Sequence, residues 1–322
     1  MTAVPNTNSF NLQDVYNSVS SHASPGNNLQ SCFDNAESSY FDPTYNTDSY
    51  APANSMLRFR NYTPVDDITY ETTYSLSVPN YVQDLWFNPT GTKLFLVTST
   101  SGVDGHIYSY DLSTPWDVST YTSWDVYIIS PKENIVQGIY IEESGLNMYI
   151  VGSYSDSVKQ YSLNPAYNAT NPTYIRSFSV ANEGNYPTDI FFKPDGTKMY
   201  IINNDNGSDI FCIYTYSLAI AWDISTAFLT SQLFDVFTGT VTDIFFDSTG
   251  RKMYLTSFGT NTIHQYYLSF PWVPSVSNLT RILNTSLTNN LGNTGIFITP
   301  DGSKLFVVEY DHPTGYIHVY NL

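Results

Sequence analysis

One short sequence motif occurs five times along this chain, and its spacing constrains the fold more than any other feature. Each copy is a turn with glycine followed by a basic residue or asparagine and a run of apolar and aromatic residues. The copies recur roughly every 50 residues, a period typical of propeller blades rather than of helical solenoids. The turn glycines are Gly91, Gly145, Gly196, Gly250 and Gly302.

Each repeat can be divided into four strands. The first and second are rich in β-branched and aromatic residues and almost continuously apolar, which favours sheets buried on both faces. Glycine between them supplies the positive φ that a tight hairpin needs. The third strand ends in Tyr-x-Leu, and the fourth follows a loop marked by proline or tryptophan, such as Pro115-Trp116. These units predict an all-β fold, a β-propeller.

The two ends of the repeat region predict how the ring closes. The fifth copy ends with its third strand at Leu322, so its fourth strand must come from elsewhere. Thr69–Val78, which precedes the first repeat, resembles the fourth strands Tyr121–Ile128 and Thr173–Val180. Pairing it with the fifth copy would remove an open sheet edge. We therefore predict a five-bladed propeller over residues 66–322.

Residues 1–65 do not repeat and form a separate predicted segment. Apolar spacing in 9–19 and 28–36 predicts two short helices. So short a segment has a marginal core, so we expect an anchoring or adaptor module that docks on a partner. A cap packed on its own propeller and an oligomerisation piece are the alternatives. The candidate anchoring residues are Phe10, Leu12, Val15, Leu29, Phe33, Leu57 and Phe59.

Composition limits the classes of partner. The net charge is -17, which argues against nucleic acid, because phosphate binding needs a basic surface. It argues equally against an anionic membrane surface, and no apolar run is long enough to insert into a bilayer. The first residues lack the basic and apolar regions of a secretory signal, so we expect synthesis in the cytoplasm.

The repeat motifs resemble those of a known group of proteins. Pro194-Asp-Gly-Thr-Lys-Met-Tyr200 and Trp222-Asp-Ile-Ser-Thr226 are similar to the propeller repeats of bacteriophage structural proteins and bacterial surface proteins. Phe10–Tyr16 and Leu57–Tyr62 resemble an anchoring module of virion proteins in phages of Bacteroidetes hosts. The resemblance implies a virion component: a head or tail fibre, a spike or a decoration protein.

Three aspartates occupy one position of the first strand, namely Asp84, Asp189 and Asp243, where the other two repeats have glycine. Because the innermost strand of a blade lines the central channel, we expect these carboxylates to converge near one channel mouth. They could accept hydrogen bonds from backbone N–H groups of neighbouring loops, bind a structural cation through oxygen ligands, or act as the acid and base of a glycoside hydrolase. Recurrence in consecutive blades favours the structural role. No other cofactor is expected.

The loops between second and third strands vary most, as expected of recognition loops on a rigid scaffold. We expect them to share one face with the connections between blades. Aromatic and polar residues together suit sugar binding, although ordinary polar loops are the alternative. The candidate ligand-binding residues are Tyr154, Asp156, Asn204, Asp205, Asp209, Tyr310 and Asp311.

The leading functional hypothesis is a non-enzymatic virion structural protein. Its N-terminal segment would bind other virion proteins, and its propeller would be displayed for attachment to a host surface glycan. A glycan-binding surface module and a five-bladed glycoside hydrolase are the alternatives. Whether the protein forms a homo-oligomer is left open. No phosphate-binding loop, dinucleotide fingerprint or nucleophile elbow is found in the sequence.

Overall fold

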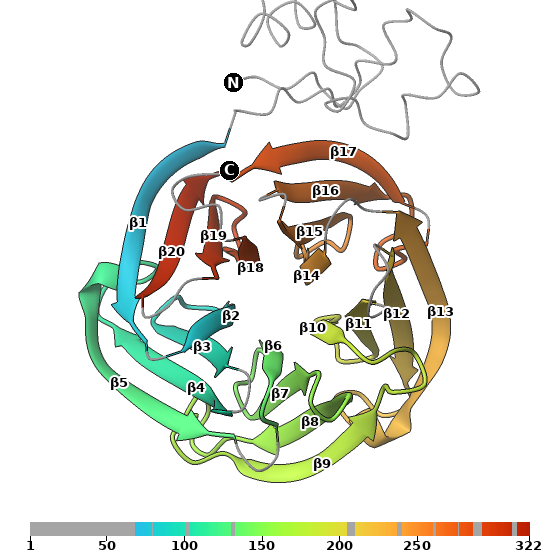
Figure 1. Cartoon of the computed structure of the whole chain (residues 1–322), viewed down its shortest axis with the longest axis horizontal. Helices are drawn as coiled ribbons and strands as arrows, with labels where there is room; N and C mark the ends of the chain where they lie inside the picture. Colours follow the sequence, from blue (N-terminus) through green and yellow to red (C-terminus); the bar gives the residue numbers. More distant parts are fainter. Residues whose placement is uncertain are drawn as a thin grey trace, which may run out of the picture.

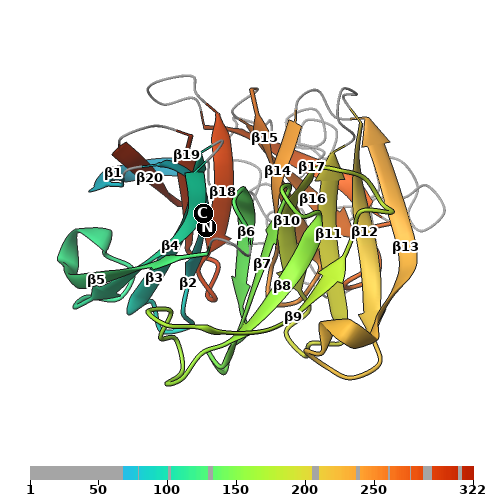
Figure 2. The same ribbon diagram turned by 60° about the horizontal axis from the view of Figure 1, so that its bottom comes forward.

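The computed structural model describes residues 68–322 except 79, 101–102, 130–132, 205–209, 237–239, 260–261, 276, 286–291 and 311–313. Its strands form five four-stranded antiparallel sheets around a central axis (Figure 1). Figure 2, the same ribbon tilted, shows the innermost strands β6, β10, β14 and β18 standing side by side around that axis. The two predicted N-terminal helices and the seven anchoring candidates, Phe10 to Phe59, lie outside the described residues.

Each blade is a sheet whose strands follow one another from the ring axis outward. Blade 1 consists, from inside to outside, of β2 (Tyr81–Phe87), β3 (Lys93–Thr100), β4 (Val103–Leu112) and β5 (Tyr121–Ile128). Blade 2 consists of β6 (Val136–Ile141), β7 (Asn147–Gly152), β8 (Ser157–Ser162) and β9 (Thr173–Ser179). Blade 3 consists of β10 (Pro187–Phe192), β11 (Lys198–Asn204), β12 (Ile210–Leu218) and β13 (Ala227–Val236). Blade 4 consists of β14 (Thr240–Phe246), β15 (Lys252–Phe258), β16 (Thr262–Leu268) and β17 (Ser277–Asn284). Blade 5 consists of β18 (Asn293–Ile298), β19 (Lys304–Glu309), β20 (Thr314–Asn321) and β1 (Thr69–Ser77).

The ring closes as the sequence predicts. β1 pairs antiparallel with β20, from Thr69 opposite Asn321 to Ser77 opposite Thr314. In Figure 1 the blue strand β1 lies outside the red strand β20, although they come from opposite ends of the described chain. The five-bladed, all-β fold is thus confirmed. The domain boundary at residue 65 stays a prediction.

Aromatic contacts hold neighbouring blades together. The ring of Tyr149 in blade 2 lies 4.4 Å from that of Phe192 in blade 3. Tyr200 in blade 3 repeats this contact with Phe246 in blade 4, at 4.6 Å. Every residue of β10 is buried, because this strand packs against sheets on both sides.

The glycine turns between first and second strands define one face of the ring, the turn face. The loops between third and fourth strands lie on it as well and carry an aromatic residue that we call the clamp. The clamp adopts a positive φ and stacks over its blade's turn glycine, so that a Cβ at Gly196 would overlap the indole of Trp222. The clamp residues are Trp116, Tyr167, Trp222 and Trp272.

The fifth blade differs at this position, since no described atom lies within 4 Å of where a Cβ on Gly302 would be. Two clamp loops contain short 3-10 helices, η3 (Val118–Thr120) and η4 (Ile224–Thr226). No helix in the described part of the chain has the length and apolar character needed to cross a bilayer.

Candidate functional site on the ring axis

The three repeated aspartates meet at the ring axis, but they are buried there rather than placed at a channel mouth. Each carboxylate accepts a hydrogen bond from a backbone N–H of the next blade's innermost strand. The donors thus belong to strands, not to the loops expected from the sequence. The pairs are Asp84 with Ile139 (2.9 Å), Asp189 with Ile244 (3.0 Å) and Asp243 with Ile296 (2.5 Å).

The two glycines at this position provide the room for the carboxyl groups. A Cβ at Gly138 would overlap Oδ1 of Asp189, and a Cβ at Gly295 would lie 2.7 Å from Oδ1 of Asp84. The Asp/Gly variation among the repeats is therefore a packing requirement at the axis.

Burial changes the protonation of this cluster. It raises the pKa of Asp243 to about 6. Burial, reinforced by the charge of Asp243, raises the pKa values of Asp84 and Asp189 well above the usual range. Oδ1 of Asp189 has no hydrogen-bond donor among the described protein groups. Burial therefore favours the protonated form of these carboxyl groups more strongly than it does for an exposed aspartate.

The surroundings of this cluster leave little space for a ligand. The cavity beside it has a volume of about 10 Å³, room for about one water molecule at most. Among the described residues, no group of three or more His, Cys, Asp or Glu side chains has a geometry suited to a metal ion. The hypothesis of a cation held by Asp84, Asp189 and Asp243 thus gains no geometric support.

A layer of aromatic rings separates the aspartates from the turn face. Each innermost strand contributes one ring, two positions after its aspartate or glycine, and neighbouring rings pack edge to face or tilted. The ring centroids of Trp86 and Tyr140 are 4.5 Å apart, and those of Phe191 and Phe245 are 5.3 Å apart. The aromatic floor consists of Trp86, Tyr140, Phe191, Phe245 and Phe297.

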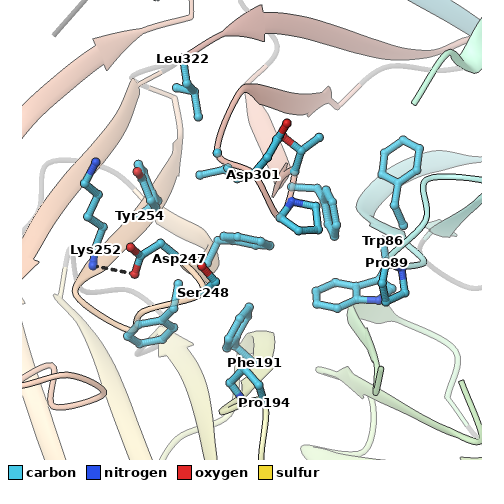
Figure 3. Close-up of a pocket in the computed structure, with 18 of the residues that line it drawn as sticks. Trp86, Pro89, Phe191, Pro194, Asp247, Ser248, Lys252, Tyr254, Asp301 and Leu322 are labelled. Atoms are coloured by element: carbon cyan, nitrogen blue, oxygen red, sulfur yellow. Dashed lines mark hydrogen bonds between the residues drawn. The ribbon is translucent and has the colours of Figure 1, made fainter. Parts of the chain in front are cut away.

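A cavity of about 560 Å³ opens above this floor on the turn face. We call its axial part the central funnel. The walls are residues of the glycine turns, and Figure 3 shows Trp86 and Pro89 across the opening from Asp247 and Lys252. Hydrogen bonds from Thr299 and Ser303 lower the pKa of the rim residue Asp301 to about 2, so this part of the rim is charged at neutral pH. The wall residues include Pro89, Glu143, Pro194, Ser248, Pro300 and Asp301.

The cavity also extends outward between blades 4 and 5. This side branch is lined by Tyr254, Gln265, Arg281 and the C-terminal residue Leu322. In Figure 3, Tyr254 and Leu322 mark it beside Asp301.

Three of the ligand candidates chosen from the sequence, Tyr154, Asp156 and Tyr310, lie on the opposite face, the loop face. There the loops between second and third strands contact the connections between blades, as expected: the N–H of Val180 donates to the carbonyl of Asp156 (2.9 Å). Tyr154 is 61% exposed. Tyr310 stacks on Tyr81, with centroids 4.2 Å apart. These candidates occupy loops of different blades.

One candidate on that face is corrected. Asn204 is the last residue of β11 rather than a loop residue, and it is buried. Its Nδ2 donates to the carbonyl of Val241 (2.8 Å) and to Oγ1 of Thr188 (3.3 Å), so it connects blades 3 and 4. Three further candidates, Asp205, Asp209 and Asp311, lie outside the described residues.

The funnel was missed from the sequence, although a signal for it exists. An aromatic residue stands two positions after the aspartate or glycine in all five repeats. Such a position is easily interpreted as core, because core strands are also rich in aromatics. Only the closed ring shows that the five rings meet at one end of the axis.

No protein-family model matches the sequence, and no curated protein matches it. Similar solved structures include a functionally unknown protein from Desulfotomaculum acetoxidans, at 14% identity and a TM-score of 0.43, with 75% of this chain and 65% of that chain covered. They also include the β-propeller domain of Cps50 (Swd1) from Myceliophteria thermophila, at 12% identity and a TM-score of 0.42, with 79% and 100% covered. Kuenenia stuttgartiensis hydrazine synthase has 11% identity and a TM-score of 0.43, with 77% and 97% covered. Similarity this distant says nothing about function.

Proposed function

We propose that the protein is a non-enzymatic recognition propeller and that the central funnel binds a carbohydrate ring. The observation that carries this proposal is an aromatic floor surrounded by polar and charged rim residues in one concave site. Binding sites for small molecules combine apolar surfaces with a few placed polar groups in this way. Sugars present both an apolar ring face and hydroxyl groups.

Trp86 is the expected stacking platform. It is partly exposed, whereas Tyr140, Phe191, Phe245 and Phe297 are buried. Its indole offers a broad flat surface. The carboxylates of Glu143 and Asp301 on the rim can accept hydrogen bonds from sugar hydroxyls.

The position of the three aspartates supports binding without catalysis. A glycoside hydrolase needs two carboxyl groups on either side of an accessible bond. Asp84, Asp189 and Asp243 lie beneath the aromatic floor and bond to backbone N–H groups. In this proposal the three aspartates therefore connect neighbouring blades and take no part in catalysis.

Substitution of Trp86 should weaken sugar binding while the fold persists. We expect Trp86→Ala to weaken binding of a glycan found on an array at least tenfold, a loss of about 1.4 kcal/mol, because the stacking surface disappears. Trp86→Phe, which keeps an aromatic surface, should lose less. Glycan arrays and calorimetry on the full chain measure both effects, and thermal unfolding shows that the variants fold.

Tyr154→Ala on the loop face is the matched control, because Tyr154 is an exposed aromatic residue remote from the funnel. It should bind as the unmodified protein does. Loss of binding in Tyr154→Ala instead of Trp86→Ala would move the site to the loop face. Absence of binding across arrays and host-surface polysaccharides would remove the carbohydrate proposal altogether.

A second proposal concerns the assembly to which the protein belongs. We propose that it is a virion structural protein in which residues 1–65 bind other virion proteins and the propeller is displayed. The observation that favours this arrangement is the pairing of β1 with β20. Because β1 completes the fifth blade, the residues before Thr69 can bind a partner while the ring stays closed.

Deleting residues 1–62 should yield a protein that folds but no longer joins the particle. Circular dichroism and thermal unfolding test the fold, and incorporation is measured by immunoblotting of purified particles. A truncated protein that folds and still incorporates would contradict the anchoring role.

A further inference from the structure

The second residue of each glycine turn lies at the rim of the central funnel, and only two of the five blades place a hydrogen-bonding side chain there. Three blades have proline, whose side chain has no polar group. Blade 2 has Glu143 and blade 4 has Ser248. All five residues line the cavity, namely Pro89, Glu143, Pro194, Ser248 and Pro300. Because Glu143 alone among them is charged, blade 2 gives the funnel a polar side that the repeat does not impose.

The carboxylate of Glu143 is open to a ligand. The preceding residue, Glu142, is buried, and its Oε1 accepts from Oγ of Ser144 (2.8 Å) and Nδ2 of Asn147 (2.5 Å). Glu143 is exposed instead. Within the described part of the chain only its main-chain carbonyl accepts a hydrogen bond, from the hydroxyl of Tyr167. The turn is therefore held by the side chain of Glu142, whereas the Glu143 carboxylate bonds none of the described groups.

The charge of Glu143 lies close to the aromatic floor. Burial, and after it the negative charge of Glu143, raises the pKa of the floor residue Tyr140. Tyr140 in turn packs against Trp86, with ring centroids 4.5 Å apart, and Trp86 is the partly exposed ring of the floor. A positive group above this side of the floor would meet an aromatic face and a carboxylate, and both attract cations.

The charged residues that line the cavity are separated along the blades. Two further carboxylates, Asp247 and Asp301, belong to the glycine turns around the axis. The two cationic residues lie farther out in blade 4, Lys252 at the start of its second strand and Arg281 in its outermost strand. In Figure 3, Lys252 stands across the opening from Trp86. The axial funnel is therefore the negative part of the cavity.

We propose that the central funnel selects an amino sugar, and that Glu143 binds its protonated amine while the sugar ring lies on Trp86. This selectivity rests on the proposed binding of carbohydrate in the funnel. An ammonium group offers three donors to the carboxylate, and a hydrogen bond between charged groups is about twice as strong as a neutral one. An N-acetyl group carries no charge. The carboxylate of a uronic acid would be repelled by Glu143 and Asp301.

Calorimetry on the full chain tests the selectivity with three oligosaccharides of equal length and linkage that differ in one ring substituent. The oligomers of glucosamine, N-acetylglucosamine and glucose carry an amine, an acetamide and a hydroxyl at that position. At pH 6 the glucosamine oligomer should bind about tenfold more tightly than the other two. Added salt should reduce this difference, because it screens exposed charges.

Glu143→Gln should remove most of the preference. Its affinity for the glucosamine oligomer should fall about tenfold, while its affinity for the glucose oligomer should hardly change. Asp195→Asn is the matched control, because Asp195 is an exposed carboxylate on the glycine turn of blade 3 that does not line the cavity. This variant should keep the preference. Thermal unfolding checks that both variants fold as the unmodified protein does.

The outcomes separate this selectivity from the carbohydrate site itself. Equal affinity for the three oligomers, with weaker binding in Trp86→Ala, would overturn the selectivity and leave the carbohydrate site standing. A preference that persists in Glu143→Gln, or that disappears equally in Asp195→Asn, would overturn the role of Glu143. Tighter binding of tetramethylammonium than of the glucosamine oligomer would contradict an amino-sugar site, because the funnel would then bind a cation without a sugar ring. No binding of any glycan would remove the proposed function and this selectivity with it.

Discussion

Asp189→Asn should increase the free energy of unfolding at pH 8, by on the order of 1–4 kcal/mol. In the native protein the pKa of Asp189 is raised by burial and by the charges of Asp243 and Asp84. An asparagine has nearly the same shape. Its oxygen can accept from the N–H of Ile244 as the carboxylate does, and its NH₂ group can donate to the neighbouring Asp243 carboxylate without adding a negative charge.

The gain should depend on pH in a direction fixed by the raised pKa values. An aspartate in the unfolded chain releases its proton near pH 4, whereas the folded cluster retains its protons to higher pH. Folding therefore takes up protons, and stability falls as pH rises from about 4 through the folded pKa values. The pKa of Asp243 in the folded protein is about 6, and the pKa values of Asp84 and Asp189 are also raised. Asp189→Asn should reduce this loss, so that its advantage is larger at pH 8 than at pH 5.

Urea unfolding followed by tryptophan fluorescence at pH 5, 6.5 and 8 measures the effect. Asp195→Asn is a suitable control, because Asp195 is an exposed carboxylate that bonds Lys193 and Thr197, and it should change stability by less than about 0.5 kcal/mol. Asp189→Ala should instead destabilise at every pH by about 1–3 kcal/mol, since it leaves the N–H of Ile244 unpaired. Parallel pH profiles for the unmodified protein and Asp189→Asn would contradict a raised pKa of Asp189.

Gly196→Ala should destabilise the ring much more than Gly302→Ala, although both glycines occupy equivalent turns. Their φ values are +70° and +73°, so each alanine incurs the same backbone cost of about 1–2 kcal/mol. At Gly196 the new methyl group would overlap the indole of Trp222, whereas no described atom lies near residue 302. Displacing the indole adds about 1–3 kcal/mol of overpacking cost, and it disturbs the carbonyl that Tyr149 and Gln160 bind.

Chemical unfolding of the two alanine variants under identical conditions isolates the contribution of the clamp. Comparison cancels the backbone term, so the difference reports the aromatic contact and the blade junction behind it. Equal losses of stability in the two variants would mean that Trp222 contributes little to the junction between blades 2 and 3.

Much of the fold follows from local patterns. The glycine turns, the apolar first two strands and the similarity of Thr69–Val78 to other fourth strands predict five blades and their closure, and β1 does pair with β20. These features are visible in a linear sequence because a hairpin turn and a strand each depend on a few consecutive residues. The loop Pro115-Trp116 was likewise recognisable, although its stacking on Gly91 was not.

The site was only partly predictable. Convergence of Asp84, Asp189 and Asp243 could be inferred, because equivalent positions of a ring face the same axis. Their exposure to solvent could not be inferred, because it depends on Trp86 and the other four aromatic residues, which close the axis above them. The assignment of Asn204 to a loop was wrong because β11 extends further than the apolar run suggested.

The sequence alone therefore determined the repeat unit, the number of blades and the strand that closes the ring, since each is encoded in neighbouring residues. Only the tertiary structure decided what the repeats enclose: carboxyl groups with raised pKa values under an aromatic floor, and a funnel on the turn face. These features arise where segments some 50 residues apart in the chain meet. The energies involved, which are burial, excluded volume and charge repulsion, depend on that contact between segments rather than on any one repeat.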